Sequence, residues 1–192
     1  MARSHRPLLV LLLLVLVGCQ ASPGPARPAG PLVVGGVFSI DSPVPWAFES
    51  VESPTLIIWT QEPGGYLSQL SFVTGIPPGG HYAPFRDAPA FYPEMTPRDI
   101  ADMTLASHVQ HGGHMEARID EVAEASFAGQ PGFRFAYSYL TRNYHRVAAV
   151  YRGRLVGDRL YMIGYTARAE LGDAGWSDAE HIMASARLLA PR

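Results

Sequence analysis

The sequence predicts a single α+β domain built on an antiparallel β-sheet. Strand-like segments fall into two groups, each followed by a helix-like segment, and the connections between neighbouring strands are short. A parallel sheet would need a long crossover, usually a helix, between successive strands. We therefore predict the order β-β-β-α-β-β-β-β-α, with both helices packed on the sheet.

The first group of predicted strands lies between residues 38 and 76. Residues 38–40 and 46–48 alternate apolar with polar side chains on either side of a Pro-Val-Pro break, which predicts a hairpin. Residues 56–59 and 66–76 follow, separated by a Pro-Gly-Gly turn. Three or four strands should therefore precede the first helix.

Residues 77–95 form a long connection rich in proline, glycine and aromatic residues. Loops of this length in compact domains often carry function. We therefore expect four aromatic side chains to contact a ligand or a partner protein, namely Tyr82, Phe85, Phe91 and Tyr92.

The first helix should begin at Thr96 and run to about His111. Thr96 suits the N-cap, Pro97 suits the first turn, and Asp99 is favourable near the positive end of the helix dipole. Two consecutive glycines, residues 112 and 113, predict its end.

The second group contains four predicted strands: residues 115–125, 133–140, 144–156 and 159–167. In the second of these, Phe133, Phe135, Tyr137 and Tyr139 share one face, while Arg134, Ala136 and Ser138 share the other. Alternating aromatic residues are typical of a sheet face packed under a helix. The alternative is a cavity that binds a hydrophobic ligand.

The last two of these strands should form a hairpin closed by Gly157-Asp158. A second helix is predicted to start at Ser177, with Glu180 completing a capping box. Its apolar face should lie on the sheet and comprises Trp176, Ala179, Ile182, Met183, Ala186 and Leu189.

The N-terminus has the three parts of a secretory signal: the basic residues Arg3 and Arg6, an apolar core at 8–17, and the small residue Gly18. Ten apolar residues rise ~15 Å as a helix, against the ~30 Å that a spanning helix must cross. The end of this segment, Leu16-Val17-Gly18-Cys19, resembles a bacterial lipobox. That resemblance implies diacylglycerol and an N-acyl chain on Cys19 as a modification.

These features divide the chain into a signal peptide (1–18), a tether rich in proline, glycine and alanine (19–34) and a globular domain (35–192). Gln20, directly after the cysteine, is similar to the signals that sort lipoproteins to the outer membrane. We therefore expect a lipid-anchored protein of the cell envelope, on the outer membrane and facing the periplasm.

Composition excludes several classes of chemistry. Cys19 is the only cysteine, so its lipidation would leave no thiol for disulfides, thiolate metal sites or nucleophilic catalysis. All basic residues are arginines, which excludes Schiff-base catalysis and a P-loop lysine. Without the signal, thirteen arginines face seventeen acidic residues, so no nucleic-acid partner is expected.

No catalytic motif is present: the chain has neither a Gly-x-Ser-x-Gly elbow nor a His-Glu-x-x-His pair. We therefore expect no catalytic residues, no cofactor and no enzymatic activity. The alternative is a metal site, because His108, His111 and His114 are spaced so that the first two share one helix face.

Four features of the chain are similar to those of one known family: the Met95-Thr96-Pro97 helix entry, the turn at 127–133, the hairpin through Gly157 and the closing segment 184–187. With the order of elements, they resemble bacterial lipoproteins of the PsbP-like fold. That fold is named for an extrinsic subunit of photosystem II and is shared with a nuclear import factor that binds the GTPase Ran. This resemblance implies an α/β/α sandwich and a non-catalytic role, binding or scaffolding an envelope protein. A periplasmic domain that binds metal or a small ligand is the alternative.

Overall fold

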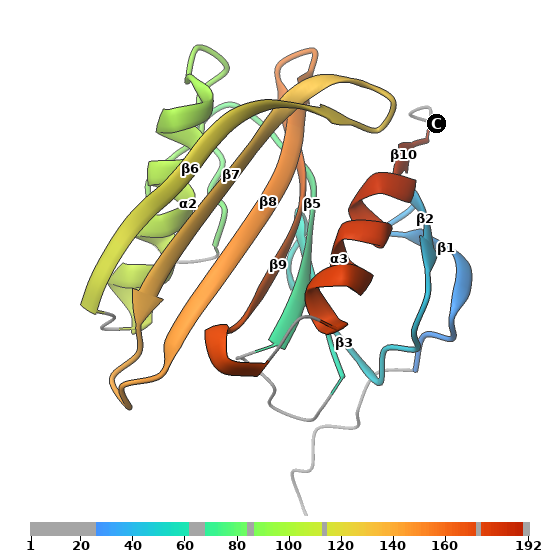
Figure 1. Cartoon of the computed structure of the whole chain (residues 1–192). Helices are drawn as coiled ribbons and strands as arrows, with labels where there is room; N and C mark the ends of the chain where they lie inside the picture. The colour runs from blue at the N-terminus through green and yellow to red at the C-terminus, as the bar shows by residue number, and fades with distance from the viewer. Residues whose placement is uncertain (1–25, 62–67, 84–86, 113–114, 172–173, 190–192) are drawn as a thin grey trace, which may run out of the picture.

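The computed structural model describes residues 26–61, 68–83, 87–112, 115–171 and 174–189. A seven-stranded antiparallel sheet forms the middle layer (Figure 1). The helix α2 covers part of one face, and the helix α3 together with a three-stranded sheet covers part of the other. The predicted α+β class, with helices on both sides of an antiparallel sheet, is confirmed.

The main sheet joins the two groups of strands through its centre. The strand β5 pairs with β9 over residues 68–76 and 160–167. This pairing joins the strands that precede α2 to those that follow it in one sheet. In spatial order the strands are β3 (Phe48–Ser53), β4 (Leu56–Thr60), β5 (Ser68–Ile76), β9 (Arg159–Arg168), β8 (Arg146–Val156), β7 (Gln130–Leu140) and β6 (Met115–Phe127).

The small sheet consists of β1 (Gly30–Val34), β2 (Phe38–Ser42) and β10 (Arg187–Leu188), with β2 in the middle. The predicted hairpin between residues 38–40 and 46–48 is wrong, because β2 pairs with β1 and β10 whereas β3 pairs with β4. Pro43 and Pro45 interrupt the ladder and send the chain from one sheet to the other. Among the described residues, five strands precede α2, not three or four.

The folded domain also begins earlier than the predicted boundary at residue 35. Residues 30–34 form β1, and the backbone of Arg27 exchanges two hydrogen bonds with Trp46 at 2.7 and 2.8 Å. The Arg27 guanidinium also binds both carboxylate oxygens of Glu49, at 3.1 and 2.7 Å. Because the segment is rich in proline and glycine, its sequence does not predict a strand. Val34 of this strand is nevertheless buried in the core, with 1% of its surface exposed.

Each face of the main sheet supports its own hydrophobic core. On the α2 side, Val73, Ile76, Phe135 and Met162 are fully covered. The core on the α3 side includes Phe38, Trp59, Phe72, Ile163 and Ile182. The central strands β5 and β9 are buried on both faces, which explains their nearly continuous apolar sequences.

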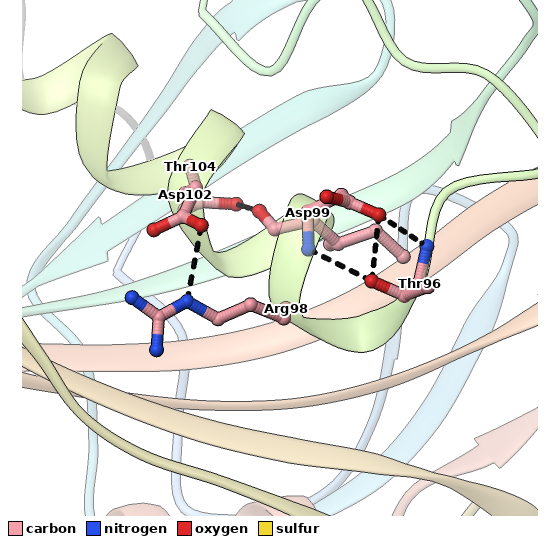
Figure 2. Close-up of polar contacts among 6 residues, drawn as sticks. Thr96, Arg98, Asp99, Asp102 and Thr104 are labelled. Carbon is pink, nitrogen blue, oxygen red and sulfur yellow. Dashed lines mark hydrogen bonds and ion pairs between the residues drawn. The ribbon is translucent and has the colours of Figure 1, made fainter.

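The helix α2 (Pro97–Gly112) starts as predicted (Figure 2). The Thr96 hydroxyl donates to Asp99 Oδ2 at 2.6 Å, and the Asp99 backbone N–H donates to Thr96 Oγ1 at 3.2 Å. The Thr96 N–H also donates to Asp99 Oδ2, which makes the cap reciprocal. Within the part of the chain that the structure describes, neither helix is long and apolar enough to cross a membrane.

The helix α3 (Ala174–Ser185) differs from prediction at both ends. It begins three residues before Ser177, and Glu180 binds Arg152 on the sheet instead of completing a capping box. It ends at Ser185 because the next residues pair with β2, and Leu189 is 39% exposed. The predicted apolar face is correct at Ala179, Ile182, Met183 and Ala186, which are buried.

The cap of α2 predicts a pH-dependent contribution to stability. Its side-chain and backbone hydrogen bonds with Thr96 lower the pKa of Asp99. The ionised carboxylate therefore stabilises the fold above the unfolded-state pKa of ~3.9, and this contribution is lost as the pH falls through the lower folded-state value. We expect Asp99→Asn to lower the melting temperature at pH 6 and the gap to close towards pH 2.5. A gap that stays constant across this range would contradict the assignment.

Candidate functional site

The aromatic side chains of β7 pack together beneath α2. Phe133, Phe135, Tyr137 and Tyr139 are each at most 4% exposed and belong to the α2-side core. Their rings stack in sequence, with centroids 6.1 to 6.3 Å apart. This face is thus packed under a helix, as the alternating pattern predicts.

Tyr151 of β8 extends this packing towards the centre of the sheet. Its ring stacks on Phe135 at 5.1 Å and lies over Gly164 of β9. A Cβ atom at Gly164 would come within 2.1 Å of the Tyr151 ring, so glycine is required there. The loop after β5 adds Tyr82, whose hydroxyl lies 2.8 Å from the Tyr151 hydroxyl. We call Tyr82, Tyr137, Tyr139, Tyr151 and His108 the tyrosine cluster.

The electrostatics of the tyrosine cluster favour neutral hydroxyl groups. Burial is the main cause that raises the pKa values of Tyr82, Tyr137 and Tyr139, and the neighbouring Tyr151 raises them further. These side chains stay protonated at neutral pH, so they act as hydrogen-bonding groups and not as bases.

Three buried hydroxyls on this face have no hydrogen-bond partner among the residues described: Ser71, Tyr137 and Thr166. Buried hydroxyls of this kind are normally satisfied by ordered water or another neutral polar group. We therefore expect water or another neutral polar group, and not an ion, to bind these hydroxyls.

His108 belongs to this cluster. Its ring packs against Tyr82 at 5.4 Å and Tyr137 at 5.8 Å and stacks on Tyr139 at 6.3 Å. The side chain of His111 and all of His114 lie outside the described residues. In the ranges that are described, no three histidine, cysteine, aspartate or glutamate residues gather to hold a metal ion. The metal hypothesis remains a prediction.

The aromatic residues of the long loop divide between core and surface. Tyr82 and Phe91 are 3% and 0% exposed, whereas Tyr92 is 47% exposed. The rings of Tyr82 and Phe91 thus close the α2-side core instead of lying on the surface, and their contact with a ligand or a partner protein stays a prediction. Phe85 lies outside the described residues, as do Cys19 and its neighbours Leu16, Val17 and Gly18.

The other face of β6, β7 and β8 is only partly covered by a second layer. The helix α3 packs mainly on β2 and β9 and reaches β8 through the Glu180–Arg152 ion pair and the buried Val150, while β6 and β7 extend beyond it (Figure 1). Because side chains alternate, the residues between the buried aromatics point to this side. We call this surface the open face; it includes Arg118, Glu121, Ala123, Arg134, Ala136, Ser138, Arg146, Ala148 and Arg152.

Two arginines occupy the centre of the open face. Arg134 and Arg152 are direct cross-strand partners, an arrangement that is unfavourable for like charges. Glu121 of β6 binds Arg134, and Glu180 of α3 binds Arg152. Arg152 Nε and the Ser138 hydroxyl, both buried, have no hydrogen-bond partner within the described ranges. The open face thus contains two half-buried guanidinium groups, and two of its buried polar groups have no hydrogen-bond partner among the described residues.

Local sequence patterns do not distinguish these arginines from ordinary solvated charges. The alternation on β7 places Arg134 opposite the aromatics, which is the one signal that identifies its face. The cross-strand register with β8 and the partner acid on α3 depend on contacts between distant residues, which no local pattern reveals.

Paired tyrosine substitutions test the hydrogen bonding in the tyrosine cluster. Tyr82→Phe removes the partner of the buried Tyr151 hydroxyl, so we expect a loss of about 1–3 kcal/mol in unfolding free energy. Tyr137→Phe removes a hydroxyl that has no hydrogen-bond partner among the described residues and should be neutral or slightly stabilising. Urea denaturation of both variants measures the difference. If Tyr137→Phe costs as much as Tyr82→Phe, the Tyr137 hydroxyl makes a stabilising hydrogen bond and the assignment is wrong.

The sequence matches no protein-family model and no curated protein. Solved structures are similar to the chain. One is a protein of Bacteroides thetaiotaomicron VPI-5482, with a TM-score of 0.49 and 10% identity, covering 85% of this chain; the chain spans only 50% of that structure. Another is LpqN, involved in cell envelope biogenesis of Mycobacterium tuberculosis, with a TM-score of 0.44 and 14% identity over 80% of this chain and 84% of LpqN.

The third is the solution structure of cyanobacterial PsbP (CyanoP) from Synechocystis sp. PCC 6803. Its TM-score is 0.55 at 13% identity, and the match covers 91% of this chain and 99% of CyanoP. The layers, the antiparallel sheet and the two helices correspond to that fold. The chain therefore has a PsbP-like fold, as the sequence resemblance implies.

Proposed function

We propose that this chain is a lipid-anchored accessory protein of the bacterial envelope, whose domain binds another envelope protein without catalysing a reaction. The observation that carries the proposal is the open face. It is a three-stranded surface that α3 covers only at its β8 edge, and it holds two opposed arginines, Arg134 and Arg152.

The anchor rests on the sequence at Cys19. The basic start, the short apolar core and the lipobox together indicate modification of this cysteine. Each buried CH₂ contributes ~0.8 kcal/mol and one chain holds only marginally, so the acyl chains of a lipoprotein give durable attachment.

The chemistry of the open face favours a protein partner. Arginine is enriched in protein–protein interfaces. Ala136 and Ala148 lie beside the two arginines on neighbouring strands. An acidic side chain of the partner would pair with the partly exposed guanidinium groups of Arg134 and Arg152.

A non-catalytic role is supported by the state of the other polar groups. Burial raises the pKa values of Tyr82, Tyr137 and Tyr139, so these side chains offer no base at neutral pH. The sequence contains no nucleophile elbow or metalloprotease motif. Binding is the activity that the exposed groups favour.

Replacing the cysteine tests the anchor. Cys19→Ser removes the thiol that accepts diacylglycerol, so we expect complete loss of labelling by radioactive palmitate and release of the protein from washed membranes. Ser22→Ala, a change of similar size in the same segment, should keep both. A Cys19→Ser protein that still incorporates palmitate would rule out the anchor.

Site-specific photo-crosslinking in intact envelopes tests the open face. A photoreactive residue at Ala148 should give one discrete crosslinked product, whereas the same residue at Asp102, on the exposed side of α2, should give none. Arg134→Gln and Arg152→Gln should weaken the Ala148 product by about tenfold, the effect of ~1.4 kcal/mol in binding.

The matched control is Arg98→Gln, which removes an exposed arginine from α2 and should leave the product unchanged. Melting curves of each variant establish that the domain is folded. If the Ala148 and Asp102 positions give the same pattern of products, or if the two arginine variants crosslink like wild type, the open face is not the binding surface.

A further inference from the structure

One end of the main sheet carries the turn between β7 and β8. At this end β7 finishes at Leu140, β8 starts at Arg146, β9 finishes at Arg168 and β6 starts at Met115. The turns at Gly129 and Gly157 lie at the opposite end, because they join the other ends of the same strands. Figure 1 shows the β7–β8 turn at the lower end of the sheet.

The β7–β8 turn holds Tyr144 in a conformation that favours glycine. Its φ is 59°, in the left-handed region. The Tyr144 N–H donates to the Thr141 carbonyl at 2.9 Å, and the Thr141 N–H donates to the His145 carbonyl at 2.9 Å. This hydrogen-bonded turn demands a left-handed residue at 144, a position where glycine is common and tyrosine is rare.

The Tyr144 side chain is not buried in the fold. It is 76% exposed, the most exposed of the large hydrophobic residues described. Its neighbour Arg142 is also exposed, and Met115, which pairs with the last residue of β7, is 40% exposed. Exposed tyrosine, methionine and arginine side chains at one tip are the kind that settle at the interface between lipid headgroups and water.

The N-terminal segment enters the domain at the same end. Arg27 bonds to Trp46 and Glu49, next to the start of β3. Cross-strand pairing leads from Phe48 through Thr60, Gln69, Thr166 and Ala149 to Tyr137, which lies shortly before the β7–β8 turn. The eight residues from Cys19 to Arg27 reach at most ~28 Å, whatever their conformation.

We propose that the β7–β8 turn is a membrane contact site, in which Tyr144 and Arg142 rest among the phospholipid headgroups beneath the anchored domain. This inference rests on the proposed lipid anchor at Cys19. The short reach from Cys19 holds this end of the sheet near the bilayer, the tyrosine ring enters the interfacial layer, and the guanidinium pairs with lipid phosphate. A left-handed tyrosine is retained for this contact, at the expense of turn stability.

Spin labels on the full-length lipidated protein test the contact. The protein is reconstituted in vesicles of phosphatidylethanolamine and phosphatidylglycerol, and a cysteine is introduced at Asn143 or, as the matched control, at Asp158 in the opposite turn. The label at residue 143 should be shielded at least about threefold more than that at 158 from a water-soluble nickel chelate. Tyr144→Gly should abolish this difference while raising the melting temperature by about 2–4 °C.

The outcomes separate this proposal from the anchor on which it rests. If Cys19 of the otherwise wild-type chain reacts with the label, the anchor is absent and both proposals fail. If Cys19 is unreactive but labels at 143 and 158 are equally accessible, the membrane contact alone is wrong. Protection of residue 143 that occurs in native envelopes but not in protein-free vesicles would assign the turn to a protein partner and overturn the proposal.

Discussion

The need to cover both faces of one sheet governs this structure. The central strands β5 and β9 are apolar on both sides, so each face requires its own layer. The helix α2 and the loop carrying Tyr82 and Phe91 provide one, and α3 with the small sheet provides the other. Cys19 is the only cysteine of the chain, so these two packed layers hold the domain without an internal disulfide.

The second layer is narrower than the sheet, and the open face results from that mismatch. The helix α3 lies mainly on β2 and β9, while β6 and β7 extend beyond it. Arg152 marks the boundary, because it stands on β8 and reaches Glu180 on α3. Its cross-strand partner Arg134 is held by Glu121 from the opposite side, so the two cations are balanced by acids that come from different elements. A surface charge pattern of this kind is set by tertiary structure.

Local patterns predicted those features that local physics determines. Thr96 and Asp99 identify the start of α2 because a cap involves residues three positions apart. The alternation from Phe133 to Tyr139 identifies a strand and its buried face. The strand at Gly30–Val34 was missed because its partner β2, not its own composition, makes it a strand. The start of α3 was misplaced because Glu180, which could cap the helix, instead binds a distant arginine.

The two proposed contacts constrain one another. With the β7–β8 turn on the membrane, the strands of the main sheet run away from the bilayer. The open face then stands upright on the membrane and is accessible from the side. Arg152 lies six residues along β8 from its first residue, about 20 Å above that lower end. A partner that meets Arg134 and Arg152 would therefore stand beside the domain at that height. An envelope protein that is itself held at the same membrane satisfies this geometry, because both partners are then confined to the same plane and meet at a raised effective concentration.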